Sequence, residues 1–297
     1  MKAKYINPFT DFGFKKIFGE EASKPLLIDF LSSLLPETNI VELNFKDKEK
    51  LGRREEDRKA IYDLYCEDNN GEKIIIELQR AKQNYFKDRT IYYSSFPIQE
   101  QAEKGSWNYE LKAVYCVGIL DFTFDEKENT EVIHTVQLKN QNNQIFYDKL
   151  KYVYLELPNF NKTEIELQTR LDKWLYFIKN LEDFETIPSI FTDEVFIQAF
   201  EKAEIASYDD EELDDYQQSL KIFRDNQNTF NYAKEESFTK GKTEGKIEGK
   251  IEGKIEGKIE GQKELTIKIT KSLLQMSMPI EDIIRLTGLT EKQISEL

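Results

Sequence analysis

The sequence predicts an α/β protein in which strands and helices alternate over about the first 160 residues and a mostly helical region follows. Two strand-like runs, 59–67 and 72–79, flank a turn-forming Asn-Asn-Gly. A third run, 111–120, is rich in Val and Ile and is typical of a buried strand. Before and after these strands, apolar residues recur at the three- and four-residue spacing that is typical of helices. Further helices are expected over 8–35 (two, the second restarting at Pro25), 84–104, 163–181, 191–206 and 210–236, and further strands over 40–45, 131–139 and 151–157.

Composition supports a folded protein and limits its chemistry. Hydrophobic residues make up 39% of the 297 residues, enough for a sizeable core, while the formal net charge is −14. One histidine, His134, and two cysteines, Cys66 and Cys116, exclude a disulfide framework, a zinc site built from several Cys and His, and mechanisms that need paired histidines. The start of the chain leads into no apolar segment, and the longest apolar run, 113–120, is too short to span a bilayer. We expect a soluble, cytoplasmic protein with no membrane partner.

The charged residues are unevenly distributed. Most of the acidic excess falls after residue 100, which argues against a nonspecific nucleic-acid coat. Basic residues concentrated in the first third leave room for a local groove: Arg53, Arg54, Arg58, Lys59, Arg80, Lys82, Lys87 and Arg89. On charge alone, a solvated surface of mixed sign is the simpler interpretation.

Residues 241–264 are a tetrapeptide repeat: Gly-Lys-Thr-Glu, four copies of Gly-Lys-Ile-Glu, and Gly-Gln-Lys-Glu. A period of four is close to 3.6, so a helix would carry the isoleucines on a slowly drifting stripe. Each glycine costs about 1 kcal/mol relative to alanine, and each well-placed Glu–Lys pair returns about 0.2–0.5 kcal/mol. We expect a linker that becomes helical when the stripe finds a partner, such as a second copy of the chain. A tract that serves only as a spacer is the alternative.

Residues 265–297 predict a small helical module. Helices are expected near 265–277, 279–287 and 290–297, and a small core from Ile283, Ile284, Leu286, Leu289 and Ile294. The last two helices look like part of a helix-turn-helix, but their acidic residues leave little positive charge for phosphate, so a protein-contact module is favoured. The repeat and this module are where a homo-oligomer would form.

The hairpin around Asn69-Asn70-Gly71 contains the residues that could perform chemistry. A three-residue turn closed by a left-handed glycine fixes a register in which Asp63 lies opposite Glu77. Since alternate residues of a strand share a face, Gln79 lies on the face of these two carboxylates. The opposite face is predicted to be a continuous apolar layer: Leu64, Cys66, Ile74, Ile76 and Leu78.

Two opposed carboxylates repel unless a cation lies between them. Mg²⁺, for which Mn²⁺ could substitute, takes oxygen ligands, so Asp63, Glu77 and the carbonyl of Leu78 form a candidate metal site. Such a metal can deliver hydroxide and stabilise charge on a phosphoryl oxygen. The alternative is that this is the solvated face of a half-buried sheet, and a register shift by one residue would separate the pair.

Five segments, in their order and spacing, resemble the recombination-promoting nuclease and transposase family, a branch of the PD-(D/E)XK nuclease superfamily. They are FTDFGFKKIFG, IYDLYC, IIIELQRAK, RTIYYSSFPIQEQAEKGSWNYELKAVYCVGILDF and VYLELPNF. The resemblance covers about residues 5–185, and the repeat is also similar to the C-terminal region of such proteins.

The resemblance implies a restriction-endonuclease-like core, a mixed sheet flanked by helices, that hydrolyses DNA. Asp63 and Glu77 match the acidic residues of the superfamily motif and would bind Mg²⁺. Gln79 stands where the superfamily usually has a lysine, although glutamine is usual in the transposase-like branch. Because glutamine carries no charge and is no base, the group that activates water is left open.

Other residues could contribute to this site. Asp11 could add a carboxylate, as first-helix acids do in similar nucleases, or cap its helix. Arg80 and Lys82 could contact phosphate or replace the missing lysine. Arg89 and Tyr93 could face the site or only pack. Three aromatic residues are assigned to the core instead: Tyr92, Phe96 and Tyr109.

These observations predict four regions: a nuclease-like core over 1–160, a helical region over 161–240, the repeat over 241–264 and the tail module over 265–297. The expected function is Mg²⁺-dependent endonucleolytic cleavage of DNA in recombination, mobile elements or defence. The alternative is a catalytically inactive, nuclease-like scaffold that binds DNA or a protein partner.

Overall fold

The computed structural model describes residues 3–47, 49–50, 60–103, 105–124 and 130–297. Four basic residues of the expected groove lie outside the described residues: Arg53, Arg54, Arg58 and Lys59. By its internal contacts the chain divides into two units, Met1–Arg224 and Asp225–Leu297.

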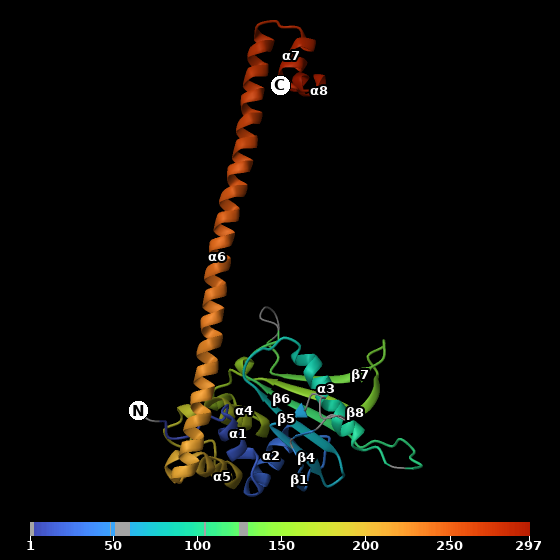
Figure 1. The fold of residues 1–297 in the computed structure, drawn as a ribbon, viewed down its shortest axis with the longest axis vertical. Helices are drawn as coiled ribbons and strands as arrows, with labels where there is room; N and C mark the ends of the chain where they lie inside the picture. The colour runs from blue at the N-terminus through green and yellow to red at the C-terminus, as the bar shows by residue number, and fades with distance from the viewer. Residues whose placement is uncertain (1–2, 48, 51–59, 104, 125–129) are drawn as a thin grey trace. The chain divides into compact units, whose positions relative to one another are not determined.

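The first unit is built on a six-stranded mixed sheet, which confirms the expected fold class (Figure 1). Its order is β1-β4-β5-β6-β8-β7; β5, β6 and β8 are parallel, and the other pairings are antiparallel. The strands are β1 (Leu43–Phe45), β4 (Leu64–Asp68), β5 (Lys73–Gln79), β6 (Val114–Leu120), β7 (Ile133–Lys139) and β8 (Ile145–Glu156). A separate pair joins β2 (Glu49–Lys50) to β3 (Ala60–Ile61).

Helices cover both faces of this sheet. The helices of the first unit are α1 (Asp11–Phe18), α2 (Lys24–Leu34), α3 (Phe86–Gln99), α4 (Arg170–Asn180), α5 (Glu194–Ala203) and the start of α6 (Asp210–Gln275). Short 3₁₀ turns occur at Glu21–Ser23, Leu157–Asn159, Glu164–Glu166, Leu181–Asp183 and Ile205–Ser207. The larger core joins α1, α2, α4 and α5 to the face formed by Leu64, Cys66, Ile74 and Ile76. The smaller core lies on the opposite face, where Phe86 of α3 packs on Tyr154 and where Tyr65 and Ile75 belong to the same cluster.

The hairpin has the expected register. Leu64 pairs with Ile76 and Cys66 with Ile74, and the turn is closed by Gly71 at φ 78°. The expected single strand over 59–67 is wrong, however, because β3 and β4 are separated by Tyr62 and Asp63. The reason is local: the Asp63 side chain, in place of a main-chain carbonyl, accepts the hydrogen bond of the Leu78 N–H at 2.6 Å.

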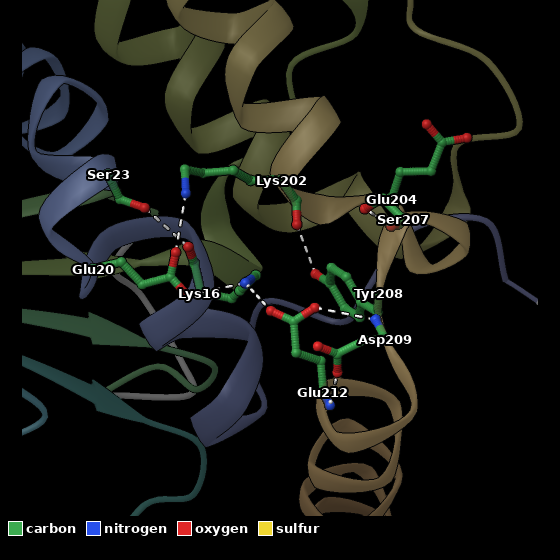
Figure 2. A network of polar contacts seen from close by, with 9 residues as sticks. All are labelled: Lys16, Glu20, Ser23, Lys202, Glu204, Ser207, Tyr208, Asp209 and Glu212. Atoms are coloured by element: carbon green, nitrogen blue, oxygen red, sulfur yellow. Dashed lines mark hydrogen bonds and ion pairs between the residues drawn. The ribbon is translucent and has the colours of Figure 1, made fainter.

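The first turns of α6 belong to the first unit and are tied to α1. The Tyr216 hydroxyl, which is buried, accepts from the Asn7 N–H at 3.0 Å, and the Ser219 hydroxyl accepts from the Phe12 N–H at 3.1 Å. Figure 2 shows the adjoining polar network, in which the mostly buried Lys16 of α1 lies between Glu20 and Glu212. These contacts fix the start of α6 beside the N-terminal end of α1.

The second unit consists of the rest of α6, α7 (Ile280–Thr287) and α8 (Glu291–Ser295). Helices were expected to end near 236 and to resume near 265; instead one helix runs from Asp210 through the repeat to Gln275. The repeat is thus helical in a single chain. Extending an existing helix avoids the cost of nucleation, so the helical segments on either side of the repeat offset the low helix propensity of its glycines.

The expected core of the tail module is only partly formed. Ile283 and Ile294 are buried together with Thr270, whereas Leu286 is 63% exposed, which corrects its assignment. Leu286 lies in the last turn of α7, which ends before Gly288 at φ 71°, and its side chain points to the exposed side of the helix.

Two further core assignments are wrong. Tyr92 is 45% exposed on α3, and Tyr109 is 78% exposed in a loop where it packs against Trp107. Phe96 is partly buried against the smaller core, as expected. Among the described residues, no helix is both long and apolar enough to cross a membrane.

Candidate active site

Asp63 and Glu77 lie at the point where the hairpin ladder ends, as the register predicts. The last paired residues are Leu64 and Ile76, so the two acidic residues follow in the next position. Asp63 accepts the Leu78 N–H, and its own backbone N–H lies against the Glu77 carboxylate. Burial raises the pKa of Asp63, and the nearby carboxylate of Asp11 raises it further, against the stabilising hydrogen bond from Leu78.

Glu77 is the more perturbed of the two carboxyl groups. Burial, followed by the charge of Asp63, raises its pKa to about 8, although Arg89 opposes this shift. Its Oε1 atom is buried and has no hydrogen-bond partner among the described residues. A buried carboxylate oxygen without a donor is costly, which is the arrangement expected where a cation would complete the site.

Gln79 is buried and both ends of its side chain are engaged. Its Nε2 donates to the carbonyl of Ala81 at 3.0 Å, and its Oε1 accepts from the Arg89 guanidinium. Arg89 also donates to Gln83 at 2.8 Å, while its Nε is buried without a partner. The structure therefore joins Gln79 and Arg89 into one pair beside Glu77.

Tyr93 lies on the same side of the sheet as Arg89. The two residues and Glu77 line a cavity of about 10 Å³ under α3, with Gly118 and Tyr154. The ring of Tyr93 packs at 5.6 Å from that of Tyr62, whose hydroxyl donates to the Tyr93 carbonyl. Tyr93 therefore both lines the cavity at Glu77 and packs against Tyr62.

Arg80 faces the other side of β5, toward α1 and α6. Burial lowers the pKa of its guanidinium, while the carboxylates of Asp11, Asp63 and Asp121 all act to raise it. The guanidinium carbon lies 5.1 Å from the centre of the Phe223 ring, which supports the side chain by a cation–π contact. Arg80 is thus a partly buried cation within electrostatic reach of three carboxylates, next to the hairpin.

A cleft of about 450 Å³ lies beside Arg80. It is formed by α1 and by the part of α6 that belongs to the first unit, and its polar lining has both signs: Asp11, Lys15, Lys16, Glu20, Arg80, Asp215, Gln218 and Ser219. Asp11 occupies the first turn of α1 and pairs with Lys15 at 2.7 Å. The helix is capped by Thr10, so Asp11 is not the cap.

Lys82 is not brought to the carboxylate pair. Its side chain is exposed and donates to the carbonyl of Phe124. Of the two basic residues expected after the second motif, only Arg80 therefore lies near Asp63.

Asp121 is a site residue that the sequence argument missed. It follows β6 directly, and its N–H donates to the Gln79 carbonyl at 3.0 Å, so it lies at the same carboxyl edge of the parallel strands. Although Asp121 is exposed at the surface, partial desolvation of its carboxyl group raises its pKa to about 6, against the charges of Lys179 and Arg80. Its position at the end of a buried strand, next to the strand of Glu77, was the signal that could have identified it.

The residues present fit a hard divalent ion with a small protein ligand set. Among the described residues no three His, Cys, Asp or Glu side chains converge, so a metal would rest on Asp63 and Glu77. Mg²⁺ commonly binds through one or two carboxylates together with water and phosphate oxygens. The unpartnered Oε1 of Glu77 agrees with such a site.

Comparison with known proteins identifies a family. The family described as PD-(D/E)XK nuclease family transposase matches residues 8–233, a range that includes every candidate residue above. No curated protein and no solved structure matches the chain. Because the matched range covers most of the sequence and the fold is a mixed sheet flanked by helices, the chain belongs to the PD-(D/E)XK nuclease family transposases.

Proposed function

We propose that this protein is a Mg²⁺-dependent endonuclease that hydrolyses phosphodiester bonds in DNA, with Mn²⁺ as a possible substitute ion. The observation that carries the proposal is the opposed pair Asp63 and Glu77, with a buried and unpartnered Glu77 oxygen. Membership of a nuclease family supports the reaction class. The process served would be recombination, the movement of mobile elements, or defence, and we propose that it takes place in the cytoplasm.

The chain's own residues would hold the metal and position the substrate. Asp63 and Glu77 would be ligands through carboxylate oxygens, and the Leu78 carbonyl is the proposed third protein ligand. The bound ion would supply an activated water and stabilise charge on the phosphoryl oxygens. The Asp63–Leu78 hydrogen bond fixes the carboxylate in place before metal binds.

Gln79 has a positioning role in this proposal. Its amide is occupied by Ala81 and Arg89, so it orients the Arg89 guanidinium beside Glu77. We assign the cationic role of the superfamily's lysine to Arg80, which is within electrostatic reach of Asp63. Asp11 and Asp121 would orient Arg80 from either side.

Cleavage of supercoiled plasmid by the full chain tests the proposal. With Mg²⁺ or Mn²⁺ we expect nicking that EDTA abolishes, and Asp63→Asn or Glu77→Gln should lower the rate by about 10³-fold or more. Glu72→Gln is the matched control, because this carboxylate lies on the same hairpin and outside the site. Cleavage that survives both substitutions would overturn the assignment.

Arg80 and Lys82 provide a second matched pair. Arg80→Ala should lower cleavage by about 10²-fold, because a preorganised cation next to the reacting phosphate is lost. Lys82→Ala should change it by less than about twofold, since its ammonium group is held by the Phe124 carbonyl. Equal losses in the two variants would exclude this assignment.

A non-catalytic scaffold is the second candidate function, and the engagement of Gln79 favours it. If folded protein neither cleaves DNA nor binds Mg²⁺ or Mn²⁺ by calorimetry, the fold serves binding alone. DNA binding without metal binding would then define the scaffold.

We also propose that the repeat over 241–264 and the tail module over 265–297 mediate self-association. The exposed isoleucines of the repeat support this proposal. Light scattering of the full chain measures it directly.

A further inference from the structure

The repeat in α6 arranges like charges along the helix. Because residues four apart are neighbours on a helix surface, the lysines at 242–258 have lysines as their next neighbours along the helix, and the glutamates have glutamates. The lysine row is Lys242, Lys246, Lys250, Lys254 and Lys258; the glutamate row is Glu244, Glu248, Glu252, Glu256, Glu260 and Glu264. In the lysine and glutamate rows named here, neighbouring lysines and glutamates are two residues apart, a spacing that does not bring side chains together on a helix. Within these rows the helix therefore lacks the expected support from Glu–Lys pairs.

The two charged rows flank an apolar row. In a helix with about 100° per residue, Lys250 and Glu252 lie about 100° to either side of Ile251. The four isoleucines of this row are 48–55% exposed: Ile247, Ile251, Ile255 and Ile259. The described structure thus presents an apolar ridge with a positive edge and a negative edge.

We propose that this face of α6 docks against the same face of a second copy of the chain, with the two helices parallel. In a parallel pair related by a two-fold axis along the helices, the lysine edge of each copy faces the glutamate edge of the other, on both sides. In an antiparallel pair lysine faces lysine and glutamate faces glutamate. Like charges repel one another along each row of a single helix. Only the parallel pair offsets this repulsion, because it brings each row next to a row of opposite charge.

The spacing also determines how the helices cross. Rows of residues four apart form ridges that interdigitate at a crossing angle of about −50°. The isoleucine row drifts by about 40° per repeat, so close contact is concentrated on the central repeats, at Ile251 and Ile255. Because the four Gly-Lys-Ile-Glu units are identical, the two helices can make the same contact in several registers. The charged edges favour those registers in which lysine lies next to glutamate.

A second copy fits this surface better than nucleic acid does. The lysine edge would attract phosphate, but the glutamate edge borders the same apolar row and would repel it. A partner must therefore carry both signs in the complementary order, and the repeat itself is such a surface. The inference does not depend on the nuclease proposal, since its tests measure association alone.

Charge variants of the full chain test the proposal. One variant carries Lys246→Glu, Lys250→Glu, Lys254→Glu and Lys258→Glu; the other carries Glu248→Lys, Glu252→Lys, Glu256→Lys and Glu260→Lys. By light scattering and sedimentation we expect the unchanged chain to dimerise and each variant alone to associate at least about tenfold more weakly. Mixing the two variants should restore association.

A charge-exchange variant is the matched control. Exchanging lysine and glutamate in all four Ile-containing copies keeps the composition and still places unlike edges together in a parallel pair, so dimerisation should persist. Association of either single-sign variant as tight as that of the unchanged chain, no rescue on mixing, or a monomeric unchanged chain would overturn the proposal.

Engineered cysteines test the orientation. Thr243 and Lys263 occupy the isoleucine position in the first and last copies of the repeat, and the native Cys66 and Cys116 are buried. When Thr243→Cys and Lys263→Cys chains are spin-labelled and mixed, a parallel pair should give shorter 243–243 and 263–263 distances than the 243–263 distance. A 243–263 distance shorter than both would show the antiparallel pair and overturn the proposal.

Discussion

The two units of this protein acquire their structure in different ways. In the first, residues far apart in the sequence form the core: Trp174 of α4 packs against Phe18, Phe30 and Phe196 and donates to Asp29 at 2.7 Å. In the second, α6 is held mainly by its own backbone hydrogen bonds, and its repeat isoleucines stay about half exposed. A site that needs fixed distances between side chains is found in the first unit, and a surface suited to association in the second.

The largest difference should appear in core truncation. Trp174→Ala removes a fully buried ring and should lower the free energy of unfolding of the first unit by about 3–5 kcal/mol. Ile255→Ala in the repeat should change the free energy of unfolding of the first unit by less than about 0.5 kcal/mol. Urea unfolding followed by near-UV circular dichroism measures both, and similar losses would show that the two units unfold together.

Buried charge in the first unit should produce the next largest effect. Without metal, the folded protein keeps the Glu77 proton up to about pH 8, whereas the unfolded chain loses it near the ordinary value of 4.5. Unfolding therefore releases a proton between these pH values, so stability falls as pH rises, by at most about 1.4 kcal/mol per pH unit.

Glu77→Gln should flatten this decline, and Mg²⁺ should stabilise the unchanged protein but not the variant above pH 7. Denaturation in EDTA across this pH range measures the decline, with Glu72→Gln as control. A slope that Glu77→Gln leaves unchanged would contradict the assignment.

The smallest effect on stability is expected from replacing glycine by alanine, and it has opposite signs in the two units. A Cβ at Gly118 of β6 would lie 2.8 Å from the Tyr154 ring, so Gly118→Ala should destabilise the first unit by about 1–3 kcal/mol. A Cβ at Gly249 or Gly253 would meet no atom within 4 Å other than the adjacent backbone of its own helix, so alanine there should stabilise the helix by about 0.5–1 kcal/mol each. Thermal melts at 222 nm would register both signs, and a loss at Gly249 would reveal a contact that requires glycine.

The sequence predicted those features that depend on residues close together in the chain. The Asn-Asn-Gly turn determines the hairpin register, and this register leaves Asp63 and Glu77 next to the last pair of the ladder, Leu64 and Ile76. The alternation of apolar residues also identified which side of the hairpin faces the larger core. The proposed metal ligands follow from these short-range rules together with the family resemblance.

Tertiary structure decided the surroundings of that pair. Only the parallel pairing of β5 with β6 brings Asp121 to the site, and only the packing of α3 brings Arg89 to Gln79. Lys82 and Arg80 are two residues apart on one segment, yet one meets Phe124 and the other Phe223.

The sequence by itself thus determined the hairpin, its acidic pair and the period of the repeat, because each depends on residues a few positions apart. The cation beside the site, the capping of α1 by Thr10 rather than Asp11, and the exposure of Tyr92 and Tyr109 depended on the folded chain. They are set by contacts between distant segments, whose energies exist only once the sheet and its helices have been assembled.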